Sequence, residues 1–278
     1  MNVIVLTQYG NPIAVLKSLN DDDHVKTRIA QYEALKNGKG LEAAKQIVLA
    51  KIRGQNELLR KYGLRWIDYY PYTQAVKAID DSDLSRVRAR LMSYEGKFSE
   101  QYFRNVFGLF NEAFRPERRT TFKAYDGLDN IFNLAYRVLS WKVHIALIKA
   151  KLEPYLGFLH GIQFGLPSLV CDFEDLYRYL IDDFLVGFCQ TVKAKDFVLK
   201  NEEYSKGKVG KREYLNEDKN RELVRTLDRY FEEKVELPRI KRGSRQEIET
   251  LINEEALLFA SYLRGEKQSW SPRTIRLT

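Results

Sequence analysis

Apolar residues recur with the spacing of an amphipathic helix over most of the chain. In the stretch 41–62, for example, Leu41, Ala44, Val48 and Ile52 fall on one side of a helix. The same periodicity and the capping signals predict helices at about 22–37, 41–62, 73–78, 82–91, 95–113, 126–152, 168–188, 216–235 and 244–264. The pattern therefore indicates a mainly α-helical protein.

The first residues alone show a convincing β pattern. VIVLTQYGNPIAVL at 3–16 holds two short β-branched runs around a turn with Gly10, Asn11 and Pro12, which predicts a hairpin. Two strands are not stable alone, so they pack on the helices or complete a sheet with another chain. We divide the chain into a β-hairpin at 1–19 and an α-helical domain at 20–278.

Two polar segments are expected to lack regular structure. The charged stretch 197–216, with Gly207 and Gly210, is interpreted as a mobile connection between helices. The tail QSWSPRTIRLT at 268–278 is expected to be loosely held.

Composition places the 278 residues among ordinary globular proteins, because 44% are hydrophobic and 13% aromatic. The net charge of +8 is compatible with a polyanionic partner but does not require one. Cys171 and Cys189 are too far apart on one predicted helix to bridge, which indicates a reducing compartment, and we expect a cytoplasmic protein. The longest apolar run, 131–152, carries several charges and is interpreted as a buried core helix, so no membrane partner is expected.

The stretch 151–178 carries the most specific candidate chemistry. His160 precedes a predicted helix on which Asp172, Asp175 and Arg178, spaced three apart, share one face. Imidazole and carboxylates together suit an ion such as Mg²⁺ or Mn²⁺. A capping cluster explains the same residues, because aspartate is favoured at a helix start and Arg178 can pair with Asp175.

Glu95 is a second acidic candidate. It begins a predicted helix with a broad aromatic stripe, and the adjacent Gly96 removes bulk where another group could approach closely. The alternative is an ordinary first-turn acid that complements the helix dipole.

Two basic segments are candidates for contact with phosphates. Residues 36–65 hold eight Lys or Arg against two Glu, and an exposed basic face there could follow a DNA backbone through Lys45, Arg53, Arg60 and Lys61. A second cluster, Arg115, Arg118 and Arg119, is expected on a loop. In both places a solvated surface explains the charge equally well.

Three segments in order resemble the motifs of a known family. SYEGKFSEQYF at 93–103 resembles a Glu-Gly then Tyr-Phe signature, and LEPYLGFLHG at 152–161 resembles Asp-Pro-Tyr-X-Gly-Phe-X-His. SLVCDFEDLYR at 168–178 resembles Ser-Leu-hydrophobic-X-Asp-X-X-(Glu or Asp)-X-Phe-Arg. These are the motifs of the CRISPR-associated spacer-acquisition integrases, the Cas-one family, and the resemblance covers nearly the whole chain.

The resemblance implies a ligand set for Mg²⁺ or Mn²⁺. Glu95, His160 and Asp175 match the family's metal ligands, Asp172 matches the accompanying acid, and Arg178 matches the arginine that orients the carboxylates. Glu174 is expected on the wrong face and is not assigned as a ligand. Lys151, Glu153 and Asp129 depart from residues common in the family, but none is a proposed ligand.

The resemblance also implies an activity and partners. The family's members are metal-dependent DNA integrases and endonucleases that join 3′-hydroxyl ends of short DNA fragments into a CRISPR array. The implied partners are double-stranded DNA, the small Cas-two protein and a second copy of the chain, with two homodimers in each integration complex. The family's β-rich N-terminal domain mediates dimerisation, and here only a hairpin at 3–16 could stand for it.

Two alternatives are kept. Arg137 and His144 fit the loose Arg-X4–6-His pattern of metal-independent HEPN ribonucleases, although both residues are expected in a buried helix. The other alternative is a DNA-binding scaffold without catalysis, in which the acidic cluster is intact but the reduced N-terminus prevents productive assembly.

Overall fold

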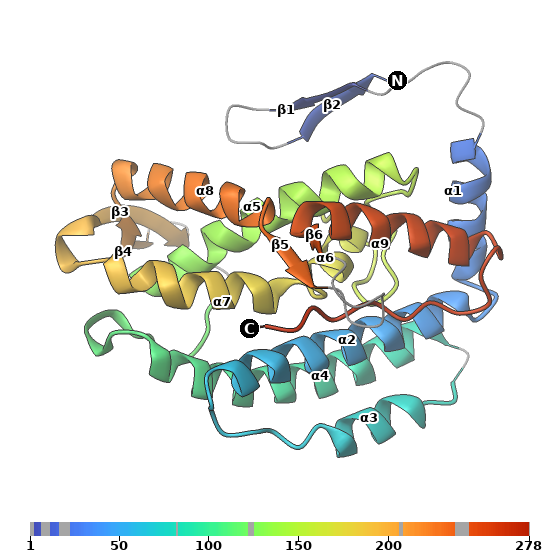
Figure 1. Cartoon of the computed structure of the whole chain (residues 1–278), viewed down its shortest axis with the longest axis horizontal. Coiled ribbons are helices and arrows are strands. Elements are labelled where there is room, and N and C mark those ends of the chain that lie inside the picture. The colour runs from blue at the N-terminus through green and yellow to red at the C-terminus, as the bar shows by residue number, and fades with distance from the viewer. Residues whose placement is uncertain are drawn as a thin grey trace.

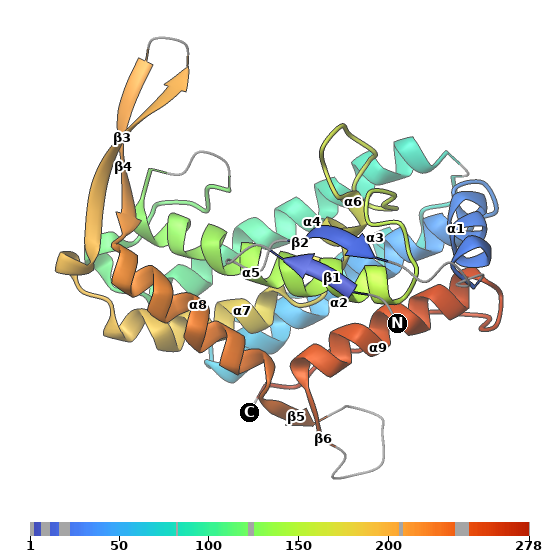
Figure 2. The ribbon, with the colours of Figure 1, turned by 90° about the horizontal axis from the view of Figure 1, so that it is seen from above.

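The chain forms a bundle of helices with short strands at its edges (Figures 1 and 2). The structure, a computed structural model, describes residues 3–6, 12–16, 23–81, 83–121, 125–205, 208–236 and 245–277. Its α-helices are α1 (Asp23–Ala34), α2 (Lys39–Lys61), α3 (Tyr70–Lys77), α4 (Leu84–Val106), α5 (Gly127–Lys149), α6 (Ser168–Glu174), α7 (Arg178–Phe188), α8 (Glu217–Phe231) and α9 (Ile248–Leu263). The predicted mainly α fold is confirmed.

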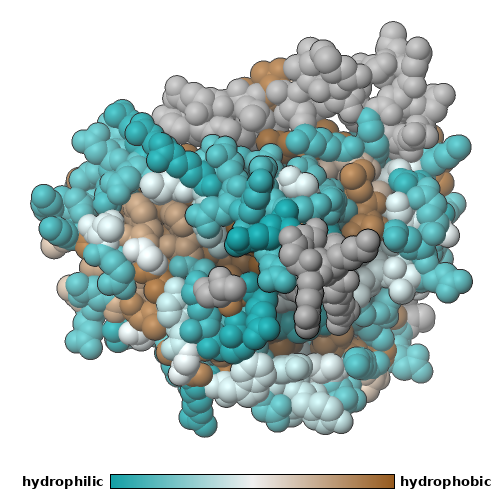
Figure 3. All heavy atoms as spheres, viewed as in Figure 1, coloured by the Kyte–Doolittle hydropathy of each residue, from teal (hydrophilic) through white to brown (hydrophobic). Residues whose placement is uncertain are grey.

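Helices α2 and α5 organise the core. α5 lies in the middle of the bundle and contacts α6, α7, α8 and α9, while α2 packs against α4 and α7. A Cβ at Gly54 of α2 would lie 2.3 Å from the Tyr179 ring, so glycine allows α7 to approach α2 closely. Polar side chains cover most of the face seen in Figure 3. By length and composition α5 could also span a membrane, but half of that stretch is buried inside the molecule.

The N-terminal hairpin has the strands that the sequence predicts. β1 (Val3–Leu6) pairs antiparallel with β2 (Pro12–Leu16). Residues 10 and 11 of the predicted turn and the boundary at 19/20 lie outside the described residues.

Residues 84–106 form one helix, whereas the sequence suggested two, at 82–91 and 95–113. The side chains of Val87, Leu91, Phe98 and Tyr102 are all buried along one stripe of α4 that crosses the expected break. A 3₁₀ turn at Phe107–Leu109 follows. A Cβ at Gly96 would meet no described residue within 4 Å, so none of the described residues explains this glycine.

The predicted helix 168–188 is also different, because it is broken into α6 and α7. Backbone hydrogen bonds from Leu176 to Phe173 and from Tyr177 to Glu174 tighten the chain into a turn between them. Cys171 and Cys189 lie on separate helical segments, and both are free, as expected.

The prediction that strands occur only at the N-terminus is wrong. The stretch 197–216, expected to be a mobile connection, forms a long antiparallel hairpin of β3 (Phe197–Ser205) and β4 (Lys208–Leu215) that projects from the helices in Figure 2. A smaller hairpin pairs β5 (Lys234–Glu236) with β6 (Arg245–Glu247). The tail was also misjudged, because Trp270, Ile275 and Leu277 are buried.

Candidate active site

Asp172 fixes the position of His160. The Asp172 side chain is completely buried on α6 and accepts hydrogen bonds from the backbone N–H groups of Phe158 (2.6 Å), Leu159 (3.1 Å) and His160 (2.8 Å). Its Oδ1 also lies 2.8 Å from Nδ1 of His160. This contact directs the other ring nitrogen, Nε2, away from Asp172, as second-shell carboxylates do for metal-binding histidines.

The surroundings of His160 raise its pKa. Burial lowers the pKa of this imidazole, but the hydrogen bond to Asp172 and the negative charges of Asp175 and Asp172 raise it, with a net increase above the ordinary value. The charge of Asp175, which belongs to the third motif, therefore influences the pKa of the histidine of the second motif.

Glu95 and Asp175 converge on the ammonium of Lys51. The Lys51 Nζ lies 2.6 Å from Oε1 of Glu95 and 2.9 Å from Oδ1 of Asp175, so α2 supplies a cation between α4 and the turn after α6. The Ser99 hydroxyl donates to Glu95 Oε1 (2.6 Å) from the next turn of α4. Two carboxylates from distant parts of the chain thus face one point.

Arg178 forms ion pairs with Glu174 and Asp175, the two acids at the turn between α6 and α7. Its Nη1 lies 3.1 Å from Asp175 Oδ1, and its Nη2 lies 3.1 Å from Glu174 Oε2. Burial raises the pKa of Asp175, but Lys51 and Arg178 lower it more, with a net decrease below the ordinary value. The Asp175 carboxylate is therefore ionised at neutral pH.

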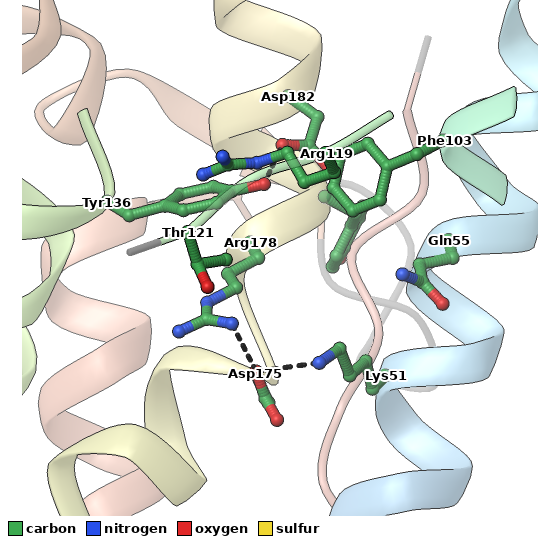
Figure 4. Close-up of a pocket in the computed structure, with 10 residues that line it drawn as sticks. Lys51, Gln55, Phe103, Arg119, Thr121, Tyr136, Asp175, Arg178 and Asp182 are labelled. Atoms are coloured by element: carbon green, nitrogen blue, oxygen red, sulfur yellow. Dashed lines mark hydrogen bonds and ion pairs between the residues drawn. The ribbon is translucent and has the colours of Figure 1, made fainter. Parts of the chain in front are cut away.

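A small cavity of about 40 Å³ lies beside these charges (Figure 4). Lys51 and Gln55 line it from α2, and Arg178 and Asp182 from α7. Asp182 is buried and accepts hydrogen bonds from the hydroxyls of Tyr102 (2.6 Å) and Tyr136. The hydrogen-bonded group of Asp182, Tyr102 and Tyr136 therefore lies next to Lys51 and Arg178 at this cavity.

The chemistry of these donors fits a hard divalent cation. Glu95 and Asp175 already meet at one positive charge, and His160 carries a ring nitrogen that Asp172 does not use. Among the described residues, however, no three His, Cys, Asp or Glu side chains lie close enough to hold a metal ion, and the Lys51 ammonium lies between the two carboxylates. The ligand set therefore stays a prediction.

Comparison with known proteins identifies the family. The family model of CRISPR associated protein Cas1 matches residues 1–225. This chain belongs to the Cas1 family. It is 30% identical over 202 residues to the CRISPR-associated endonuclease Cas1 2 of Pyrobaculum aerophilum, and the match covers 71% of this chain. The chain spans 65% of that relative's length.

Solved structures share the fold. A casposase bound to integration product matches 97% of this chain and 77% of its own, with a TM-score of 0.80 and 19% identity. A partial Cas6-RT-Cas1–Cas2 complex matches 100% of this chain and 82% of its own, with a TM-score of 0.75 and 18% identity. At these identities the likeness concerns the fold alone.

The structure brings Glu95 and Asp175 together at Lys51 but separates Asp172 from Asp175. Asp172 and Asp175 do not share a partner, because Asp172 turns to the loop before α6 while Asp175 turns to Lys51 and Arg178. Glu174 is buried and contacts Arg178.

Lys51 and Asp182 were not predicted from the sequence as site residues. Both stand inside apolar runs, IVLAKI and YLIDDFL, where a charge at a helix position that packs inward is unusual. That signal could have found them.

The basic residues predicted on α2 mostly contact the protein itself. Lys45 Nζ donates to the carbonyl of Ile79, and Lys61 pairs with Asp183 at 2.9 Å. Arg53 and Arg60 donate to carbonyls of the C-terminal tail. Arg60 is exposed, whereas Lys45, Arg53 and Lys61 are half-buried, and contact of these four residues with DNA stays a prediction.

The loop arginines differ among themselves. The Arg119 side chain is 7% exposed, pairs with Asp129 at 2.9 Å and donates to Asn133, while Arg115 donates to the carbonyl of Phe110. Arg118 is exposed. A role in DNA contact stays a prediction for all three.

Arg137 and His144, the residues of the ribonuclease alternative, were expected to be buried on one helix. Arg137 is exposed rather than buried, and it lines a cleft of about 470 Å³ between α5, β4 and α8. The His144 ring lies edge-on to Tyr155, and burial lowers the pKa of that imidazole.

Proposed function

We propose that this chain is a metal-dependent DNA integrase and endonuclease. It inserts short DNA fragments, the spacers, into a CRISPR array by attack of a 3′-hydroxyl on a phosphodiester. The observation that carries the proposal is the convergence of Glu95 and Asp175 on one cation, beside a histidine that a buried aspartate orients. Membership of the Cas1 family supports the same activity.

Glu95, His160 and Asp175 would hold Mg²⁺ or Mn²⁺. When bound, such an ion acts as a Lewis acid on the phosphodiester and stabilises the charge that develops on its oxygens. The chain itself contributes orientation: Asp172 holds the His160 ring, and Arg178 holds Asp175. This chemistry requires no protein nucleophile, because the attacking group belongs to the DNA or to water.

The proposed partners are double-stranded DNA and Cas2. The basic residues Lys45, Arg53, Arg60, Lys61, Arg115, Arg118 and Arg119 are the candidates for backbone contacts, which predicts salt-dependent and sequence-tolerant binding. Two homodimers of this chain would flank Cas2 in the integration complex. The names of two structural neighbours, a Cas1–Cas2 complex and a casposase bound to integration product, support these partners.

Strand transfer tests the proposal directly. A short duplex with free 3′-hydroxyls is incubated with Cas2 and a supercoiled plasmid that carries a CRISPR repeat, in Mn²⁺ or in EDTA. We expect joining in Mn²⁺ only, and a loss of at least about 100-fold in Glu95→Ala, His160→Ala and Asp175→Ala, with duplex binding retained.

Glu174→Ala is the matched control. It removes a neighbouring buried acid whose partner, Arg178, keeps its contact with Asp175, so strand transfer should continue. An equal loss in Glu174→Ala would show that the ligand assignment is wrong. Tight DNA binding without joining in the wild type would favour the scaffold alternative, and RNA cleavage that persists in EDTA would favour the ribonuclease alternative.

A further inference from the structure

The Lys51 ammonium lies between the carboxylates of Glu95 and Asp175. Its ammonium contacts Glu95 and Asp175 from a buried position on α2, where its side chain is 10% exposed. Burial lowers the pKa of this ammonium, but the two carboxylates raise it, with a net increase, so Lys51 is charged at neutral pH. Without this ammonium, Glu95 would have no cation partner among the described residues, and Asp175 would keep only Arg178.

Gln55 offers an unused acceptor one helical turn away. Its Nε2 donates to the Ser99 hydroxyl at 3.0 Å, but its Oε1 is buried and has no hydrogen-bond partner among the described residues. A buried amide oxygen without a donor is unfavourable, and native proteins rarely leave one. Figure 4 shows Gln55 on the same helix as Lys51, beside the cavity that both residues line.

The two carboxylates and the Gln55 Oε1 are two alternative partners for the Lys51 side chain. We infer that the Lys51 ammonium takes the place of the active-site cation in the metal-free protein and moves to Oε1 of Gln55 when a divalent ion binds. Residues four apart on a helix are neighbours, and the flexible lysine stem allows the ammonium to change position without backbone movement. The inference rests on the proposed function, since it needs Glu95 and Asp175 to be metal ligands.

The inference makes Lys51 a competitor of the metal. A divalent ion bound by Glu95 and Asp175 would repel an ammonium that stayed within 3 Å of the same oxygens. Part of the binding free energy is therefore used to displace Lys51. If Lys51 instead held the carboxylates in place for the metal, its removal would weaken metal binding.

Mn²⁺ binding measured without DNA tests whether removal of the Lys51 charge strengthens or weakens metal binding. Free Mn²⁺ is measured by electron paramagnetic resonance during titration of the full chain. We expect Lys51→Met, which keeps the length of the side chain without its charge, to lower the Mn²⁺ Kd about tenfold. Gln55→Leu keeps Lys51 but removes the acceptor to which it moves, and should raise the Kd about threefold.

Lys39→Met is the control. It removes a lysine from the same helix, where Nζ contacts the carbonyls of Tyr262 and Leu263 instead of the acids, and should leave the Kd unchanged. Thermal unfolding provides a second readout, because metal-free Lys51→Met leaves Glu95 without a cation partner among the described residues and Asp175 with Arg178 alone. Its Tm should be lower than that of the wild type, and Mn²⁺ should raise it by more.

An equal or higher Kd in Lys51→Met would overturn the inference. If this variant does not fold, Gln55→Leu decides, since an unchanged Kd there excludes the second position. Wild-type protein without saturable Mn²⁺ binding would contradict both the metal site and the inference. Wild-type protein that binds Mn²⁺ but joins no DNA would contradict only the proposed function.

Discussion

Asp172, Asp175 and Asp182 lie on one stretch of chain, but their carboxylates meet different kinds of partner. Asp172 accepts backbone N–H groups and orients His160, and Asp175 lies between the cations of Lys51 and Arg178. Asp182 meets two tyrosine hydroxyls in the core. The partners decide the task of each acid, since a carboxylate beside cations stays ionised while one among buried neutral groups tends to hold its proton.

Asp182 should make the stability of the fold depend on pH. Burial raises its pKa from 3.8 to about 6, although the tyrosine hydroxyls lower it in part. The folded protein then binds more protons than the unfolded chain between about pH 4 and 6, so this group's contribution to stability falls as pH rises through that window.

Asp182→Asn keeps the shape of the side chain and cannot ionise. Relative to the wild type, its free energy of unfolding should rise by roughly 2 to 3 kcal/mol from pH 4 to pH 7, which urea unfolding of both proteins at several pH values would measure. A difference that stays constant over this range would mean that Asp182 has the same pKa in the folded and unfolded chain.

At the scale of elements, the sequence predicted those parts whose signal is local. The long stripes of α2 and α5 and the N-terminal hairpin could be recognised, because periodicity and turn residues are properties of short windows. The hairpin β3–β4 could not, since Leu199 and Val209 stand 66% and 64% exposed and the strand sequences FVLKNEEYS and KVGKREYL do not alternate apolar with polar residues. Its pairing depends on contacts at its base with distant residues.

Gly127 shows how that base is held. Its N–H donates to Glu213 of β4, and a Cβ at this position would lie 2.3 Å from the Phe197 ring and 2.6 Å from Glu213 Oε2. Gly127→Ala should therefore displace the hairpin and destabilise the protein by about 1 to 3 kcal/mol. Faster proteolysis between residues 197 and 215 would detect the displacement.

Gly96→Ala is the matched control for this prediction. A Cβ there meets nothing within 4 Å, and the position is inside α4, so alanine should stabilise the protein by about 0.5 to 1 kcal/mol. Equal effects of the two substitutions would mean that the contact of Gly127 with the hairpin does not hold the hairpin in place.

The site is a property of the whole molecule. Glu95 comes from α4, Lys51 from α2, and His160 and Asp175 from the two sides of α6. The motifs around Glu95, His160 and Asp175 could be recognised from the sequence because family resemblance preserves them. The position of Lys51 could not, because nothing within α2 tells which distant acids its ammonium will meet.

The C-terminal tail also contributes to the whole molecule, because it contacts helices that are far apart in the sequence. The Tyr179 hydroxyl of α7 donates to the Ile275 carbonyl (3.0 Å) and accepts from the Ile275 N–H (2.7 Å). Trp270 stacks on Phe173 and donates from Nε1 to Glu255 of α9 at 2.7 Å. The tail thus completes the core between α6, α7 and α9 instead of lying loosely on it.

Replacing Trp270 measures how much the tail contributes. Trp270 is 5% exposed, so Trp270→Ala should leave a cavity against Phe173 and lower the free energy of unfolding by about 3 to 5 kcal/mol in urea denaturation. Trp66→Ala removes the same side chain from a position that is 52% exposed, and should cost about 1 kcal/mol. Similar small losses in both variants would mean that the tail is loosely held. A large loss confined to Trp270→Ala would mean that residues 268–277 belong to the cooperative core, and that truncation before Trp270 unfolds the candidate active site together with the bundle.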